Sequence, residues 1–580
     1  MRGGSSMKRF IYLIIIAVAS LFVSSCSLDE HNYVEIQKDS YINDAKQAES
    51  VLLGVYRNLV TDGLYGYHLS LFFTLGTDEA KVEGNSLTNY RNVPNNAYTS
   101  TEDEVQATWQ ALYNGVYEAN DFIERLSVKW QEFSTEDQRL AAVYMAEARA
   151  LRALFYFELV RWFGNVPLMT ATAQSHQHPS TFVQAAPVDV YAFIEQDLLY
   201  AVETLPYASE DIYRSSNSFR ISKGGALGLL AKVYATWAGY PLCDESKWEQ
   251  AAKTAQVLIN SGKHGLLEDF EQLWYNSGAG SWDPKESLIE VSFYSPTITG
   301  NGTNDSSGRI GKWNGVSAAA EAVNCGRIAA NWKVLPTFAL DWYESGYPND
   351  RRWEISCADH KYTADAGRTS LWTYKEKVDG KEVVRNGYWA LAADPNAKAD
   401  YRKNYNNNMC PGKWDIPKYV TEENNIVDAN VSNVNWYVLR YADVLLLYAE
   451  ALNEWKKGPS NEAFAAVNAV RRRGYGLPVS TASSVADLDA SLGYEQFRQA
   501  VRKERAHELA FEGHRRQDLI RWGVYYSTIR ATFDALAEWH DQSQEYYKLA
   551  QYTVEGKNEL LPIPQRDKDL CSQFKQNPGW

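Results

Sequence analysis

Cysteine is scarce in this chain, with six residues among 580. Setting Cys26 aside leaves an odd number, and no two of them form a CxxC pair; they are Cys243, Cys325, Cys357, Cys410 and Cys571. The nine histidines show no HExxH or similar ligand spacing. These patterns argue against a zinc site and against a disulfide framework. We expect isolated core thiols, no bound metal and no cofactor.

The chain also lacks the basic excess and the short motifs of several large protein classes. Its formal net charge is −14, so it has no surplus of cations to displace counterions from phosphate, which argues against nucleic-acid binding. No GxSxG motif, no P-loop and no GxGxxG motif in a βαβ context is present. The 45% hydrophobic content is ordinary for a packed globular protein.

Long hydrophobic runs are missing except near the start. Residues 10–23 form one apolar run of fourteen residues, shorter than the roughly 20 that span a bilayer. Lys8 and Arg9 precede the run, and Val23-Ser24-Ser25 leads directly to Cys26, which resembles a bacterial lipoprotein box. We expect residues 1–25 to be a signal peptide, Cys26 to be acylated, and 26–43 to be a polar anchor segment. The alternative is an ordinary secretory signal in which Cys26 is incidental.

Helical periodicity dominates three parts of the chain, 44–60, 105–262 and 440–522. In 146–168 two apolar stripes predict a helix buried on more than one side. Arg440–Arg473 has the 34-residue length and the helix–turn–helix pattern of a tetratricopeptide unit, and Gly225–Gly262 is a degenerate second example. Residues 61–104 favour loop. Residues 281–437, rich in Trp, Gly, Asn and Asp, predict an irregular subdomain with small helices and strands.

The segment ERAHELAFEGHRRQD, residues 504–518, has the composition of a catalytic site. Helical spacing favours a structural role, because Arg505 can meet Glu508, and Glu512 can meet Arg515 and Arg516, as i, i+3 or i+4 pairs. We therefore expect no catalytic residues here.

Aromatic residues in polar surroundings are the stronger functional signal. A flat ring exposed on a rigid scaffold can stack on the apolar face of a sugar, while nearby Asn, Asp and Arg can hydrogen-bond its hydroxyls. For any single ring, a place in the local core is the competing interpretation. The rings in such surroundings are Tyr90, Tyr98, Trp282, Trp313, Trp332, Trp372, Trp389 and Trp414.

Several motifs occur in a characteristic order along the chain: AEARALRALFYFELVRWFGNVPL, KESLIEVSFY, RYADVLLLYAEALNE, NAVRRRGY, ERAHELAFEGHRRQDLIRWG and LLPIP…QNPGW. Together they resemble the SusD/RagB family of outer-membrane nutrient-binding lipoproteins. The resemblance implies a mostly α-helical SusD-like fold, in which four tetratricopeptide-like helix pairs support an irregular ligand-binding half within one unit over 44–580. It also implies a lipid-anchored protein exposed at the cell surface, partnered by a SusC-like TonB-dependent transporter.

The resemblance further suggests where ligand would bind. It places the ligand face on the early loop and on the middle region, and the Thr77-Asp78-Glu79 sequence matches a family feature near that face. The candidate ligand-binding residues are Asp78, Tyr90, Arg91, Asn92, Tyr98, Trp282, Tyr294, Trp313 and Trp332.

The leading prediction is therefore a non-catalytic protein that binds oligosaccharide or polysaccharide and delivers it to the transporter. One alternative is an interaction protein of the same system that binds peptides or glycopeptides, since helical repeats often present such a groove. A surface glycosidase is the third possibility; it would need an acid and a base in one cleft, with their carboxyl groups about 5–9.5 Å apart.

Overall fold

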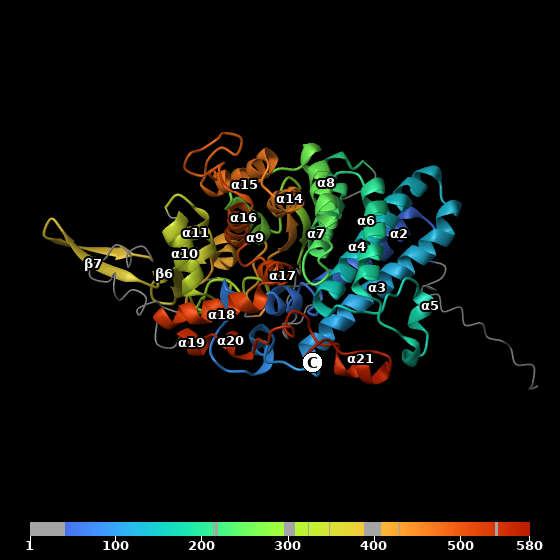
Figure 1. Ribbon diagram of the computed structural model, residues 1–580, viewed down its shortest axis with the longest axis horizontal. Helices are drawn as coiled ribbons and strands as arrows, with labels where there is room; N and C mark the ends of the chain where they lie inside the picture. Colours follow the sequence, from blue (N-terminus) through green and yellow to red (C-terminus); the bar gives the residue numbers. More distant parts are fainter. Residues whose placement is uncertain are drawn as a thin grey trace, which may run out of the picture.

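The computed structural model describes residues 41–580 except 213, 215–217, 295–307, 323, 347, 388–407, 429 and 540–542. Cys26 and Trp389 therefore lie outside the described residues. The protein is mostly α-helical, as predicted (Figure 1). Within the described ranges, no helix combines the length and apolar character needed to cross a membrane.

The larger helices form an array in which successive members pack side by side: α3 on α4, α4 on α6, α6 on α7, α7 on α8, α8 on α14, and α14 on α15 and α16 (Figure 1). The predicted units 225–262 and 440–473 correspond to the packed pairs α7/α8 and α14/α15. The array and the helices beside it are α2 (Ala45–Arg57), α3 (Asp103–Lys129), α4 (Thr135–Phe163), α6 (Pro187–Thr204), α7 (Lys223–Ala238), α8 (Lys247–Asn260), α14 (Tyr441–Lys456), α15 (Asn461–Gly474), α16 (Tyr494–Glu508), α17 (Arg515–Arg521) and α18 (Tyr525–Ala535).

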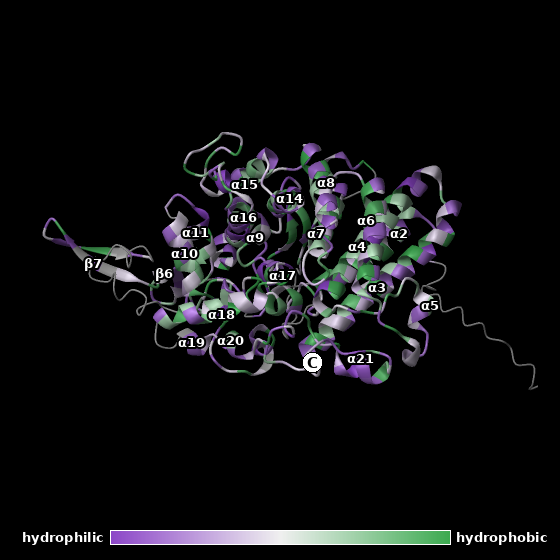
Figure 2. Cartoon of the chain, in the orientation of Figure 1, coloured by the Kyte–Doolittle hydropathy of each residue, from purple (hydrophilic) through white to green (hydrophobic). Residues whose placement is uncertain are grey.

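Helix α4 lies in the middle of this array and is buried on more than one side, as its two apolar stripes predicted. It begins at Thr135, earlier than expected, because Ser134 caps it by accepting a hydrogen bond from the Asp137 amide. It ends at Phe163, and the following Gly164 has a φ of 69°, which favours glycine. Apolar residues concentrate along α4 and α7, whereas the peripheral α21 (Gln565–Leu570) is mostly polar (Figure 2).

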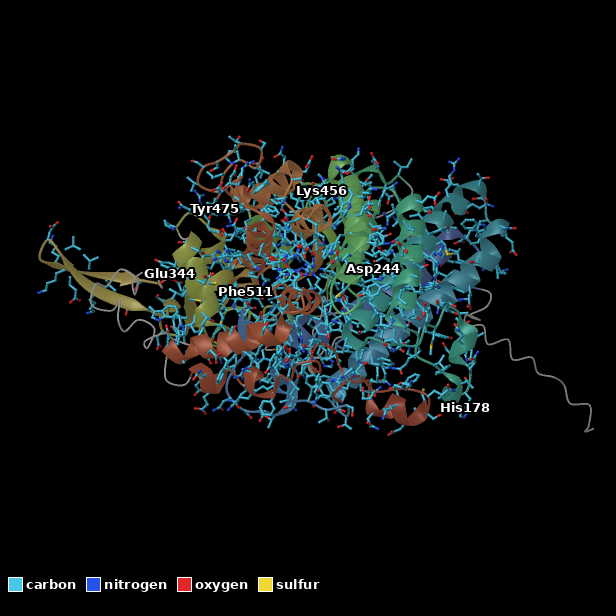
Figure 3. All side chains as sticks on the ribbon, viewed as in Figure 1. His178, Asp244, Glu344, Lys456, Tyr475 and Phe511 are labelled. Carbon is cyan, nitrogen blue, oxygen red and sulfur yellow. The ribbon has the colours of Figure 1, made fainter. Side chains whose placement is uncertain are left out.

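The predicted single helix over 494–522 is wrong. Helix α16 ends at Glu508 and α17 begins at Arg515, with Phe511 (φ 63°) and Gly513 (φ 83°) in left-handed conformations between them. Tertiary contacts hold the break, because the Phe511 amide donates to Glu79 Oε2 at 3.2 Å and its ring packs edge-on against Phe338. Phe511 lies near the centre of the molecule (Figure 3).

The irregular half contains short helices and paired strands, as the composition of residues 281–437 predicted. The strand pairs are β1 (Ala80–Val82) with β3 (Trp332–Val334), β2 (Ser287–Val291) with β10 (Trp436–Arg440), β4 (Cys357–Ala358) with β9 (Cys410–Pro411), β5 (His360–Thr363) with β6 (Gly367–Ser370), and β7 (Thr373–Val378) with β8 (Lys381–Asn386). The β7–β8 hairpin projects from the body (Figure 1). The short helices are α5 (Thr172–Ser175), α9 (Gln272–Ala279), α10 (Pro336–Gly346), α11 (Arg352–Ser356), α13 (Ile416–Tyr419), α19 (Ser543–Tyr546) and α20 (Leu549–Tyr552).

The early loop is more ordered than its composition suggested. Residues 61–104 include a π-helix (His68–Phe73), strand β1 and two short 3-10 helices. Antiparallel pairing of β1 with β3 joins this early segment to the middle region more than 200 residues later. That pairing brings together the residues of the candidate site.

Candidate functional site

Four rings from distant parts of the chain form what we call the aromatic cluster: Tyr67, Phe72, Tyr90 and Trp313. Tyr90 and Trp313 meet edge to face, with ring centroids 5.1 Å apart and planes at 89°. Tyr67 lies 4.9 Å from Trp313 at 68°, and Phe72 stacks on Tyr90 at 5.5 Å and 14°. Such offset and perpendicular arrangements are favoured for aromatic pairs.

The backbone fixes each member of the aromatic cluster. Tyr67 immediately precedes the π-helix that carries Phe72. Tyr90 follows β1, and its hydroxyl donates to Asn331 Oδ1 at 3.1 Å, immediately before β3. The Asn331 amide donates in turn to the Trp313 carbonyl at 2.5 Å. The β1–β3 ladder therefore holds Tyr90 and Trp313 against each other.

The cluster has a buried floor and a partly exposed surface. Phe72 is only 2% exposed, whereas Tyr67, Tyr90 and Trp313 are each partly exposed. Trp313 Nε1 is buried and finds no acceptor among the described residues, so the accessible part of this indole is carbon surface. Such a surface suits stacking on an apolar ligand face rather than donating a hydrogen bond.

Charged and polar groups surround the rings. The Arg91 guanidinium lies 4.6 Å from the Tyr90 centroid, and that of Arg309 lies 4.1 Å from the Tyr67 centroid. Asp62 accepts from Arg309 at 2.7 Å, which orients the guanidinium along the ring. The arrangement offers flat apolar faces flanked by multiple N–H donors, the combination that binds a hydroxyl-rich ligand.

Tyr67, Tyr90 and His68 are uncharged at neutral pH, and burial shifts the pKa of each further from 7. It raises the pKa of the Tyr90 phenol, with Arg91 opposing the shift, and it raises the pKa of Tyr67 further. It lowers the pKa of His68, which lies 5.3 Å from Tyr67, to about 4. The arginines and Asp62 therefore supply the charge, and the rings supply neutral surface.

Three of the sequence-predicted residues come together here, namely Tyr90, Arg91 and Trp313. Tyr294 is 61% exposed and follows Phe293, whose ring packs at Gly308, next to Arg309. Trp282 is partly exposed but lies beside Phe219, with centroids 6.1 Å apart, and makes no ring contact with the aromatic cluster among the described residues.

The other predicted residues serve the fold. Tyr98 and Trp332 are each 3% exposed, so they offer a ligand no surface and we remove them from the site. Tyr98 stacks on Trp580 at 4.9 Å, and Trp332 Nε1 donates to the Leu71 carbonyl at 3.0 Å. Trp372 and Trp414, also in polar sequence, are buried too.

Asp78 and Asn92 are engaged by other side chains. Arg515 donates to both carboxylate oxygens of Asp78, at 2.9 and 2.6 Å. This pair lines a different cleft, of about 740 Å³, beside α10, α16 and α18. Asn92 donates to Glu102 Oε1 at 3.2 Å, just before α3. Among the described residues, no hydrogen bond or ion pair joins either side chain to the aromatic cluster.

Sequence reasoning missed several members of the site. Tyr67 and Phe72 lie in YGYHLSLFF, which lacked a helical period because it forms a π-helix. Arg309, Asp62 and Asn331 carried no local signal, since only tertiary pairing brings them to the rings. The one available hint was the density of aromatic residues in a Gly-rich early loop.

A second cavity, of about 320 Å³, lies between α3, α5 and the C-terminal segment. Trp109, Tyr113 and Phe182 contribute to its mainly apolar wall. It shares no residue with the aromatic cluster. Trp109 is 3% exposed, so its ring is not a free platform.

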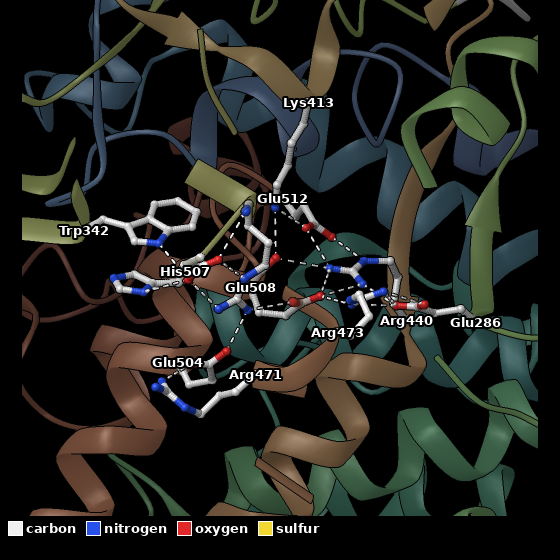
Figure 4. Close-up of polar contacts among 12 residues, drawn as sticks. Glu286, Trp342, Lys413, Arg440, Arg471, Arg473, Glu504, His507, Glu508 and Glu512 are labelled. Carbon is white, nitrogen blue, oxygen red and sulfur yellow. Dashed lines mark hydrogen bonds and ion pairs between the residues drawn. The ribbon is translucent and has the colours of Figure 1, made fainter. Parts of the chain in front are cut away.

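The acidic and basic segment 504–518 forms a buried ionic network (Figure 4). Glu508 accepts from Arg352 at 2.9 Å, from Arg440 at 3.2 Å and from Arg473 at 2.5 Å. The side chains of these four residues are 0% exposed. Although burial alone would raise it, the three guanidiniums lower the pKa of Glu508 to about 2. Glu508 is thus a permanent structural anion at neutral pH.

The predicted i, i+3 and i, i+4 pairings within this segment are wrong, because Arg505 and Glu512 bind other partners, most of them outside the segment. Glu512 accepts from Lys413 and Arg440, both at 2.7 Å. Arg505 donates to Asp443 at 2.7 Å and to Asp518 at 2.9 Å. The network therefore ties α16 and α17 to α14 and to the irregular half.

The described part of the chain contains no disulfide bond and no metal-binding cluster. Its five cysteines are free thiols, of which all but Cys243 are buried. The described residues hold no group of three or more His, Cys, Asp or Glu arranged to bind a metal ion.

Comparison with known proteins identifies the family. Residues 261–580 match the model of the SusD family. The chain belongs to the SusD family. Residues 28–235 match a second model, described as "Starch-binding associating with outer membrane". A SusD-like protein of Formosa agariphila is 27% identical over 523 residues, covering 89% of this chain and 91% of the relative.

Solved structures of SusD-like proteins share the fold. A SusD homologue from Bacteroides thetaiotaomicron is 56% identical, with a TM-score of 0.87 over 94% of this chain and 99% of that one. A laminarin-binding SusD-like protein is 27% identical, with a TM-score of 0.65 over 92% of this chain and 99% of that one. The mostly α-helical, SusD-like fold implied by the sequence motifs is confirmed.

Proposed function

We propose that this SusD-family chain binds oligosaccharide or polysaccharide at the cell surface, without catalysis, and delivers it to a SusC-like TonB-dependent transporter. The observation that carries the proposal is the partly exposed aromatic cluster flanked by Arg91 and Arg309. Family membership and a laminarin-binding relative at 27% identity support it. The description of the second matching family model supports a location at the outer membrane.

Binding would follow from stacking and hydrogen bonding together. The apolar face of a sugar ring would pack on the carbon surface of Tyr90 or Trp313, releasing water from both. The guanidinium groups of Arg91 and Arg309 would donate to hydroxyls around the ring edge. Each contact is modest, so we expect micromolar to millimolar dissociation constants, about −4 to −8 kcal/mol.

The lipid at Cys26 would complete the mechanism by confining the protein near its transporter. Captured glycan would thus stay at high local concentration beside the barrel. Two or more acyl chains hold a protein stably on a membrane.

Calorimetry against a panel of polysaccharides and their oligosaccharides tests the proposal. We expect at least one glycan to bind, without release of reducing sugar over hours of incubation. Parallel titrations with peptides separate this function from peptide capture. If peptides bind and no glycan does, the proposed function is wrong. Delivery predicts that deleting the gene abolishes growth on the bound glycan and that the protein co-purifies with a TonB-dependent transporter.

A further inference from the structure

Two lysines face each other across the strand pair beside the aromatic cluster. Lys81 of β1 and Lys333 of β3 are direct partners in the antiparallel register. Direct partners place their side chains on the same face of the sheet, with Cβ atoms about 5 Å apart. The two residues are 5% and 4% exposed. Two like charges are thus buried side by side, which is unfavourable without compensation.

Among the described residues, this compensation is limited to the attraction of Glu83, two residues further along the chain from Lys81. In the described structure neither lysine forms an ion pair, whereas other buried lysines do: Lys232 pairs with Asp443 at 3.0 Å and Lys413 with Glu512 at 2.7 Å. Lys81 Nζ reaches only the Val82 carbonyl, at 3.4 Å. Lys333 Nζ lies 3.5 Å from Cys410 Sγ. Most of the hydrogen-bonding capacity of both ammonium groups is therefore unused.

The groups around Lys81 explain its titration. Burial and the neighbouring Lys333 lower the pKa of Lys81 to about 8, while Glu83 raises it in part. The Tyr546 ring of α19 lies 5.3 Å from Lys81 Nζ and covers it. Glu545, also on α19, accepts a hydrogen bond from Asn85 at 3.2 Å. Lys81 therefore loses part of its charge just above neutral pH.

The lysine pair is continuous with the aromatic cluster. The ladder extends one step further, since the Glu83 amide donates to the Asn331 carbonyl at 2.7 Å. Residues two apart on a strand share a face and lie about 7 Å apart, so Asn331 and Lys333 are neighbours on one side. Asn331 Oδ1 also accepts the hydrogen bond from the Tyr90 hydroxyl. A ligand stacked on Tyr90 would thus have the lysine pair within reach of its substituents.

We propose that Lys81 and Lys333 form an anion subsite of this surface, and that the preferred ligand is a glycan carrying carboxylate or sulfate groups. This assignment rests on the glycan-binding function proposed above. An anionic group between the two ammonium groups would remove their repulsion and accept charge-assisted hydrogen bonds from both. The Tyr546 ring, 5.3 Å from Lys81 Nζ, would border the bound anion.

Charged polysaccharides paired with their uncharged forms test the assignment. Polygalacturonate and alginate would each be compared with the carboxyl-reduced polymer, and sulfated galactans with the desulfated polymer, by affinity electrophoresis and calorimetry. We expect the charged member of at least one pair to bind about tenfold or more tightly than its neutral form. The carboxylate and sulfate arms show which anion is preferred. Equal binding of both members in every pair overturns the anion subsite and leaves the proposed function intact, whereas no binding by any glycan overturns both.

Substitutions locate the effect. K81Q and K333Q should each weaken binding of the charged polymer about tenfold and leave the neutral polymer unchanged. K375Q is the matched control, because it removes the same charge from a side chain that is 67% exposed on the β7–β8 hairpin. If K81Q and K333Q bind the charged polymer as tightly as K375Q does, the assignment is wrong. Thermal melts confirm that each variant is folded.

A second readout does not depend on any variant. An anion bound beside Lys81 raises its pKa, so binding at pH 8 takes up a fraction of a proton. Calorimetry in two buffers of different ionisation enthalpy measures this uptake. We expect uptake with the charged glycan, none with the neutral form, and weaker binding as pH rises above 8. Absence of uptake with a charged glycan that binds contradicts the subsite.

Discussion

Tyr90 stands perpendicular to Trp313, with ring centroids 5.1 Å apart and planes at 89°, although 223 positions separate them in the sequence (313 − 90). The hydrogen bond from Tyr90 to Asn331 and the β1–β3 pairing fix this relationship before any ligand arrives. A preorganised platform loses little conformational freedom on binding, so modest stacking energies translate into useful affinity.

Removing either ring should weaken glycan binding. We expect Y90A and W313A each to raise the dissociation constant at least tenfold, a loss of about 1.4 kcal/mol. Y90F keeps the ring and loses only the hydroxyl bond to Asn331, so its effect should be smaller. W455A is the control, since Trp455 is 38% exposed on α14 and lies outside the aromatic cluster. Calorimetry with an oligosaccharide that binds the wild type measures the four dissociation constants. A larger loss of affinity in W455A than in W313A would contradict the prediction.

The buried network predicts a stability effect without a functional one. Changing Glu508 to Gln removes the one buried carboxylate that Arg352, Arg440 and Arg473 share. Each arginine keeps at least one other carboxylate partner, so we expect a cost of about 3 kcal/mol in the free energy of unfolding, at the low end for a broken buried ion pair. The exposed Glu495 on the same helix provides the control E495Q. Urea denaturation measures both, and a loss in E508Q no larger than in E495Q would show that the network does not stabilise the fold.

The same residue gives a pH dependence of known sign. The pKa of Glu508 is about 2 in the folded protein against an ordinary value of 4.5. Its stabilising contribution is therefore complete above about pH 4.5 and is lost as pH falls toward 2. Unfolding free energies between pH 6 and 3 should fall more steeply in the wild type than in E508Q. Parallel curves would be the contrary result.

Glu79 should make the stability of the fold depend on pH in the opposite direction. Burial raises its pKa from 4.5 to about 8, despite Arg515 nearby. A carboxyl group with a raised folded-state pKa contributes stability that is complete below pH 4.5 and is lost as pH rises toward 8. Because E79Q mimics the protonated acid, its stability relative to the wild type should improve steadily between pH 5 and 8. A difference that stays constant with pH would exclude this explanation.

Lipidation at Cys26 predicts where the protein resides in the cell. C26A should move the protein from the membrane fraction to the soluble fraction and abolish labelling with a radioactive fatty acid, because the acyl chains supply the membrane affinity. The buried C571A is the matched control and should stay on the membrane. A C26A protein that remains membrane-bound would mean that something other than this lipid holds it there.

Sequence patterns predicted the regular part of this molecule well. Helices such as α6 and α7 carry apolar stripes that depend only on neighbouring residues, so periodicity located them. The break between α16 and α17 was invisible, because it depends on Phe511 bonding to Glu79, more than 400 residues away.

The site was only partly predictable for the same reason. Tyr90 and Tyr98 occupy similar polar sequence, yet the first contributes to a partly exposed platform and the second stacks in the core on Trp580. Which ring faces solvent is decided by what packs over it, and that information lies far away in the chain. Asn331 and Arg309 were missed because single polar residues give no periodic signal.

A crystal structure of the protein with a bound oligosaccharide tests the glycan platform most directly. We predict a sugar ring packed face-on against Tyr90 or Trp313, with hydroxyls within hydrogen-bonding distance of Arg91 or Arg309. A complex in which the glycan occupies the cavity between α3 and α21, or any other surface, while the aromatic cluster stays free would contradict the proposed site.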